Sequence, residues 1–161
     1  MQSFAVQDAP PGGISETSMQ ASLLRADIAL ATGSFSATDE SASRVIDELQ
    51  RSAARDFFSA YEARAAVIKG EALSGSGGGT EALSWLERGV SMSSALMDES
   101  KSPSLADAET ALARCLGDLG KKDRARLFAA RAAAILATHK DIGKQSEHPL
   151  RDLHGRADLR H

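Results

Sequence analysis

Few residues of this chain have the type and spacing that catalysis or metal binding requires. The single cysteine, Cys115, would need a nearby base to act as a nucleophile, but it stands beside Leu116 in an apolar stripe, where cysteine packs as a small hydrophobic residue. No HxxxH spacing or cysteine cluster joins the four histidines, which stand at 139, 148, 154 and 161. Paired carboxylates, a Ser–His–Asp set and kinase motifs are also missing. We therefore predict no enzymatic activity, no metal site and no cofactor.

The Gly-rich segment GSGGGT at 75–80 has backbone amides that could hold a phosphate, because it comes directly before an expected helix. It lacks the GxxxxGK[ST] spacing of nucleotide-binding loops, and no predicted strand precedes it. Runs of glycine and serine are ordinarily linkers. We interpret this segment as a loop between helices.

The composition favours helices and excludes several classes of protein. The 161 residues are rich in alanine and leucine, poor in β-branched residues, and only 4% aromatic. No apolar run approaches the roughly 18–20 residues of a membrane span, and the formal net charge of −3 argues against general nucleic-acid binding. A single cysteine suits a reducing compartment. We predict a cytoplasmic protein with no membrane or nucleic-acid partner.

Apolar residues recur at helical spacing along most of the chain, with breaks at glycine and proline. The segment 33–41 is turn-like, and 40–74 forms one helix or two with a break near 54–56. Glycine is expected to end the first helix at Gly33 and the last at Gly143. The predicted helices cover 15–32, 40–73, 80–97, 105–119 and 124–142.

The helical domain is predicted to span residues 15–143. Residues 1–14, which include Pro10, Pro11, Gly12 and Gly13, show no periodicity and are expected to form a flexible leader. Residues 144–161 are expected to form a mostly polar tail.

An internal repeat is visible in this pattern. Gly33, Gly77 and Gly120 stand 44 and 43 residues apart, and the windows 80–92 and 122–135 align at an offset of 43. A helix–turn–helix unit that recurs at this period is typical of an α-solenoid.

The segment Leu105–Ile142 resembles a tetratricopeptide repeat (TPR). The matching residues are Leu112 and Ala113 on the first helix, Gly120 in the turn, and Ala125 and Ala132 on the second helix. Two positions depart from the family pattern, since Ala129 replaces the usual aromatic residue and Ala137 replaces the usual proline. The stretch 104–153 is also similar to the carboxy-terminal helical repeats of some large bacterial regulators and Ser/Thr kinases.

The resemblance implies an all-α fold of antiparallel helical hairpins, stacked as a short right-handed TPR-like array. It also implies a non-catalytic module that binds a peptide or partner domain on a concave face, lined by the first helix of each hairpin. On the third hairpin this face lies opposite Leu112 and Leu116, so that an exposed Arg114 should tolerate charge reversal without loss of stability. The predicted partner-binding residues are Asp107, Thr110, Arg114 and Asp118, with Arg64 and Glu71 one repeat earlier.

Two alternatives stay open. A regulatory domain that senses a small molecule would have a polar pocket between hairpins at His139 and Cys115, which a solid apolar core there would exclude. The basic residues at 121–131 form either a solvated helix face or a docking site for an acidic segment.

The register of the last helix separates packing positions from exposed ones. Ala132 falls at a close approach between helices, where a leucine should overpack at a cost of about 1–3 kcal/mol. Arg131 points away from that line and should tolerate leucine within about 0.5 kcal/mol. Trp85 is expected to pack between hairpins rather than to stack on a ligand.

Overall fold

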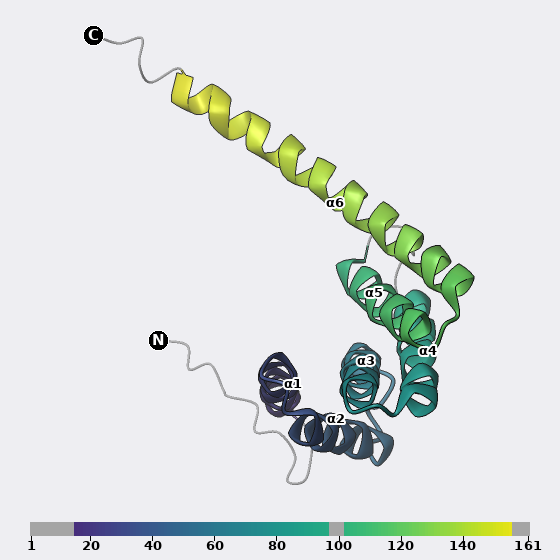
Figure 1. Cartoon of the computed structure of the whole chain (residues 1–161). Helices are drawn as coiled ribbons and strands as arrows, with labels where there is room; N and C mark the ends of the chain where they lie inside the picture. Colours follow the sequence, from purple (N-terminus) through teal and green to yellow (C-terminus); the bar gives the residue numbers. More distant parts are fainter. Residues whose placement is uncertain (1–14, 97–101, 156–161) are drawn as a thin grey trace, which may run out of the picture.

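The computed structural model describes residues 15–96 and 102–155, with side chains up to residue 139, and this part of the chain is helical without any strand. Its helices form three antiparallel hairpins, α1–α2, α3–α4 and α5–α6, and each hairpin contacts the next (Figure 1). The all-α prediction of stacked hairpins is confirmed. The expected leader at 1–14 lies outside the described residues. The helices are α1 (Glu16–Ala31), α2 (Phe35–Gln50), α3 (Ser59–Gly75), α4 (Gly79–Leu96), α5 (Pro103–Asp118) and α6 (Lys122–Gly155).

The three hairpin turns are built in the same way. Gly33, Gly77 and Gly120 have φ values of 73°, 89° and 74°, in the left-handed region that glycine adopts without strain. The residue after each glycine donates its N–H to the carbonyl five residues earlier, and the glycine donates to the carbonyl three residues earlier. This is the Schellman motif that ends many helices. The same turn therefore recurs at the spacing of 44 and 43 residues seen in the sequence.

The region 40–73 contains two helices, α2 and α3, separated by residues 51–58, which include the expected break. Helix α2 begins at Phe35, so our interpretation of 33–41 as a turn is wrong beyond Ser34. Tertiary packing explains the early start. Thr38 is fully buried and its hydroxyl donates to the Ser34 carbonyl at 3.0 Å.

The glycine-rich loop is shorter than expected, because Gly75 belongs to α3 and α4 begins at Gly79. Both glycines make room for a neighbouring hairpin. A Cβ atom on Gly75 would meet the ring of Phe35 at 2.4 Å, and one on Gly79 would meet Cδ2 of Leu119 at 2.8 Å. These positions therefore serve packing between hairpins.

Helix α6 continues to Gly155, so the expected end at Gly143 is wrong, and the predicted domain boundary at 143 falls inside a helix. A glycine in a helix interior costs only about 1 kcal/mol relative to alanine, which does not by itself end a helix. Figure 1 shows α6 extending far beyond the end of α5. No helix in the described part of the chain combines the length and the apolar character needed to cross a membrane.

Two apolar clusters hold the hairpins together, and α3 contributes to both. The first joins α1, α2 and α3, and the partly buried Trp85 of α4 packs against it. The second joins α4, α5 and α6, with Val67 of α3. Trp85 therefore packs between hairpins, as predicted, with Lys69 and Arg88 each 5.2 Å from its ring centroid.

Cys115 is 1% exposed and lies in the second cluster, among leucine and alanine side chains. Burial raises the pKa of its thiol, and Sγ lies 3.7 Å from the Gly79 carbonyl oxygen. An apolar core thus surrounds this residue, in the place where the small-molecule alternative required a polar pocket.

Gly89→Ala and Gly117→Ala are expected to change stability in opposite directions. A Cβ atom at Gly89 would lie 2.6 Å from Cγ2 of Val67 and 3.2 Å from the Val67 backbone nitrogen. Because valine is stiff at χ1, overpacking of about 1–3 kcal/mol outweighs the gain in helix propensity. At Gly117 no described atom lies within 4 Å of the added Cβ apart from its chain neighbours and the backbone of its own helix, so the propensity gain of about 0.5–1 kcal/mol remains. Urea denaturation gives the free energy of unfolding of both variants. If both were more stable than wild type, the close approach of α3 and α4 would be contradicted.

Candidate partner-binding groove

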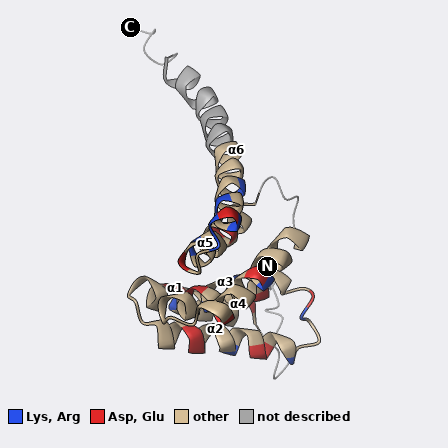
Figure 2. Ribbon diagram, turned by 45° about the vertical axis from the view of Figure 1, so that its right-hand side comes forward, with Lys and Arg blue, Asp and Glu red and all other residues tan. Residues whose placement is uncertain are grey.

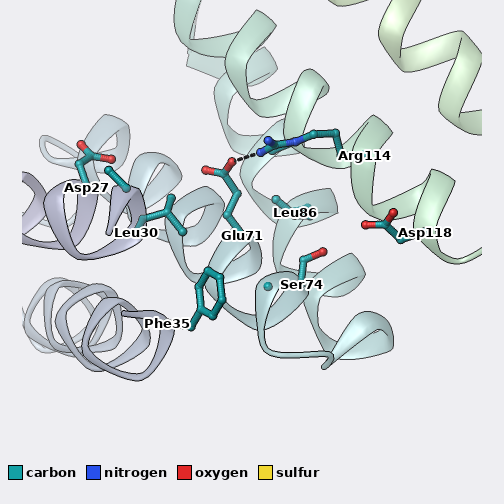
Figure 3. A pocket seen from close by; sticks show the side chains of 11 residues that line it. Asp27, Leu30, Phe35, Glu71, Ser74, Leu86, Arg114 and Asp118 are labelled. Carbon is teal, nitrogen blue, oxygen red and sulfur yellow. Dashed lines mark hydrogen bonds and ion pairs between the residues drawn. The ribbon is translucent and has the colours of Figure 1, made fainter. Parts of the chain in front are cut away.

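A cavity of about 490 Å³ lies where the first helices of the three hairpins, α1, α3 and α5, face one another (Figure 3). Helix α3 contacts both α1 and α5, so the three helices form a continuous surface. We call this cavity the groove. Its lining residues are Asp27, Leu30 and Ala31 of α1, Phe35 of α2, Glu71, Ser74 and Gly75 of α3, Leu86 of α4, and Ala111, Arg114 and Asp118 of α5.

The groove is built from equivalent positions of the three hairpins. Asp27, Glu71 and Arg114 each stand six residues before the glycine of their own hairpin turn. A second set stands two residues before those glycines and comprises Ala31, Gly75 and Asp118. The repeat that shapes the turns therefore also brings a charged side chain from each hairpin to one surface.

Two ion pairs tie neighbouring first helices together beside the groove. Nη2 of Arg114 lies 2.5 Å from Oε1 of Glu71, which links α5 to α3. Nη2 of Arg64 lies 2.6 Å from Oδ1 of Asp27, which links α3 to α1. The Arg114 side chain stays 67% exposed while that of Glu71 is only 18% exposed. Arg114 is thus a bridge between hairpins as well as an exposed charge.

The electrostatic environment of Glu71 is unusual for a surface carboxylate. Burial raises the pKa of the Glu71 carboxyl, because the ionised form loses hydration. The charges of Arg114 and Arg64 oppose this rise, whereas those of Asp27 and Asp107 add to it. Burial, rather than an excess of neighbouring negative charge, is therefore the cause of the raised pKa of Glu71.

The structure brings three of the predicted partner-binding residues, Glu71, Arg114 and Asp118, into the groove lining. Arg64 lies on α3 and lines a smaller cavity of about 150 Å³ near Ser102. Asp107 and Thr110 are exposed on α5 and do not line the groove, and the Thr110 hydroxyl donates to the Ala106 carbonyl at 2.7 Å.

Sequence reasoning missed the contribution of the first hairpin, above all Asp27, Leu30 and Phe35. The signal was present for Asp27, because its spacing to the turn glycine equals that of Glu71 and Arg114. Phe35 gave no such signal, since it stood in a segment that we interpreted as a turn.

Three of the five basic residues at 121–131 make ion pairs within the chain, and Figure 2 shows blue and red segments close together around α5 and the start of α6. Arg124 lies 2.8 Å from Glu87, and Arg126 lies 3.4 Å from Asp123. Nη2 of Arg131 lies 2.8 Å from a carboxylate oxygen of Glu109, a residue with no exposed surface. These pairs reduce the positive charge that an acidic partner would meet, although Lys121 and Lys122 make no ion pair with a described residue. Because of this ion pair, we now expect Arg131→Leu to cost more than the roughly 0.5 kcal/mol expected from the helical register.

Comparisons with known proteins add no assignment to this picture. A scan against models of protein families found no match, and neither did a search of curated proteins. The groove and the repeat that builds it are therefore the features from which a function can be inferred.

Proposed function

We propose that this protein is a non-catalytic, TPR-like interaction module whose groove binds an extended segment of a partner protein. One observation carries the proposal: equivalent positions on three successive first helices converge on a single cavity of about 490 Å³. The resemblance of residues 104–153 to tetratricopeptide repeats, and to repeats of bacterial regulators and kinases, supports the proposal of an interaction module. A cytoplasmic location is part of the proposal and is supported by the single cysteine.

The lining of the groove suits a peptide. Binding sites of about 300–1,000 Å³ commonly combine apolar walls with a few placed polar groups. Here Leu30 and Phe35 supply apolar surface, while Glu71, Arg114 and Asp118 supply charges from two different hairpins. Such a mixture holds apolar side chains and fixes the register of an extended chain at the same time.

Arg114→Gln is expected to change the affinity for the partner at least about tenfold, because it removes a charge from the groove lining: affinity rises for a basic segment and falls for an acidic one. The partner is isolated by pull-down from native cytosol, identified by mass spectrometry, and titrated calorimetrically against both proteins. Arg44→Gln is the matched control, because Arg44 is an exposed arginine on α2 that pairs with Glu40 outside the groove. Equal affinities for wild type and Arg114→Gln would contradict the proposal.

Arg114→Glu is less suitable than glutamine for this test. It would place a second carboxylate beside the partly buried Glu71, which destabilises by like-charge repulsion in addition to any loss of binding. The expectation that charge reversal at Arg114 leaves stability unchanged does not agree with this ion pair.

A further inference from the structure

The groove and its rim carry more carboxylates than guanidinium groups. Two of the carboxylates already have a cationic partner, in the Arg114–Glu71 and Arg64–Asp27 pairs. Asp118 makes no ion pair with any residue that the structure describes. The groove lining contributes the carboxylates of Asp27, Glu71 and Asp118 and the guanidinium group of Arg114, and the rim consists of Asp107 and Arg64, whose charges act on Glu71.

Apolar surface lies beside these charges. Leu30 and Phe35 wall the groove from the first hairpin, and the Phe35 ring is seated over Gly75, where a Cβ atom would collide with it. In the view of Figure 3, Ser74 lies between Glu71 and Asp118. Lysine and arginine side chains complement this surface, because each has an aliphatic stem for the apolar wall and a positively charged end for the carboxylates.

We infer that the segment bound in the groove is basic: an extended peptide whose arginine or lysine ends between Glu71 and Asp118, with its stem against the wall of Leu30 and Phe35. This inference rests on the proposed function and specifies its partner. An acidic segment fits poorly, since it would meet unpaired Asp118 and would compete with Glu71 for Arg114. Three of the five basic residues at 121–131 are already paired within the chain, which makes that surface less attractive to an acidic segment.

The test is a selection from a displayed library of random nine-residue peptides on the full chain. We expect the selected peptides to be enriched in arginine and lysine and depleted in aspartate and glutamate. Fluorescence anisotropy then gives the affinity of one selected peptide for wild type and two variants. Asp118→Lys should weaken binding at least about tenfold, as reversal of a contacting charge does.

Asp47→Lys is the matched control. It makes the same charge change on an exposed residue of α2 outside the groove lining, and should alter affinity less than about twofold. Asp118 is the last residue of α5 and is exposed, so that lysine there suits the helix dipole and the variant should fold, as a thermal melt will verify.

The other outcomes are distinguishable. Acidic peptides that depend on Asp118 would overturn the inference and leave the proposed function standing. Basic peptides weakened equally by Asp118→Lys and Asp47→Lys would report general attraction to an acidic chain and would also overturn it. A library that yields no binding peptide would overturn the proposed function together with the inference.

Discussion

Replacing Arg131 with leucine is expected to lower the free energy of unfolding by about 3 kcal/mol, within the usual range for removing one partner of a buried ion pair. Arg131 on α6 reaches Glu109 on α5, whose side chain has no exposed surface, with 2.8 Å between Nη2 and Oε1. Leucine removes this charge partner from a carboxylate that has no exposed surface, which destabilises the folded state. Urea denaturation at pH 7 measures the loss.

Arg126→Leu is the matched control, in the same helix. Arg126 lies 3.4 Å from Asp123, and both side chains are largely exposed, at 78% and 98%. Exposed pairs contribute little, so this variant should stay within about 0.5 kcal/mol of wild type. Equal midpoints for Arg131→Leu and Arg126→Leu would show that the pair with Glu109 does not hold the third hairpin together.

Glu62→Gln is expected to lower the free energy of unfolding by about 2 kcal/mol at pH 7, because it breaks a buried charge network. Glu62 is 1% exposed and accepts two hydrogen bonds from Arg55 at 2.8 Å, and one from Arg88 at 2.5 Å. This network fastens the 51–58 connection to α3 and α4. Glu71→Gln, the same substitution on the same helix, should cause no loss, because burial opposes the ionised form there.

The pH dependence of these two variants should differ in sign. The hydrogen bonds from Arg55 lower the pKa of Glu62 below its unfolded value of about 4.3. Its stabilisation is therefore present above that value and is lost as the pH falls through the lowered pKa, so wild type and Glu62→Gln should converge in acid. The raised pKa of Glu71 acts in the opposite way, since its stabilisation is present in acid and is lost as the pH rises through that pKa. The measurement is the urea midpoint of wild type and of each variant between pH 3 and pH 7. If the midpoint of wild type exceeded those of both variants by the same amount throughout this range, this assignment would be contradicted.

The hairpins were predictable because their signals are local. The turns are predicted by Gly33, Gly77 and Gly120, because only glycine adopts the left-handed backbone of a Schellman motif without strain. The stripe through Leu112 and Leu116 was likewise readable from helical spacing, and both residues are buried. The placement of Glu71, Arg114 and Asp118 along one groove follows from the same periodicity.

What the sequence concealed depends on contacts between distant segments. Phe35 starts a helix inside a serine-rich stretch because its ring packs on Gly75, a residue 40 positions away. Glu109 is a buried charged residue of α5, and helical spacing alone does not predict its ion pair with Arg131 of α6. Gly143 lies within α6, whereas the glycines of the three hairpin turns lie between helices. Its local sequence did not distinguish it from a glycine that ends a helix.

The most direct test of the account is an amide NMR titration of the isotope-labelled full chain with the tightest peptide from the library selection. The account predicts that the largest shift changes cluster on α1, α3 and α5, around Asp27, Glu71 and Arg114, with the outer faces of α2 and α6 unmoved. Largest changes on α2 or α6, with the groove residues unmoved, would contradict the claim that the first helices form the binding surface.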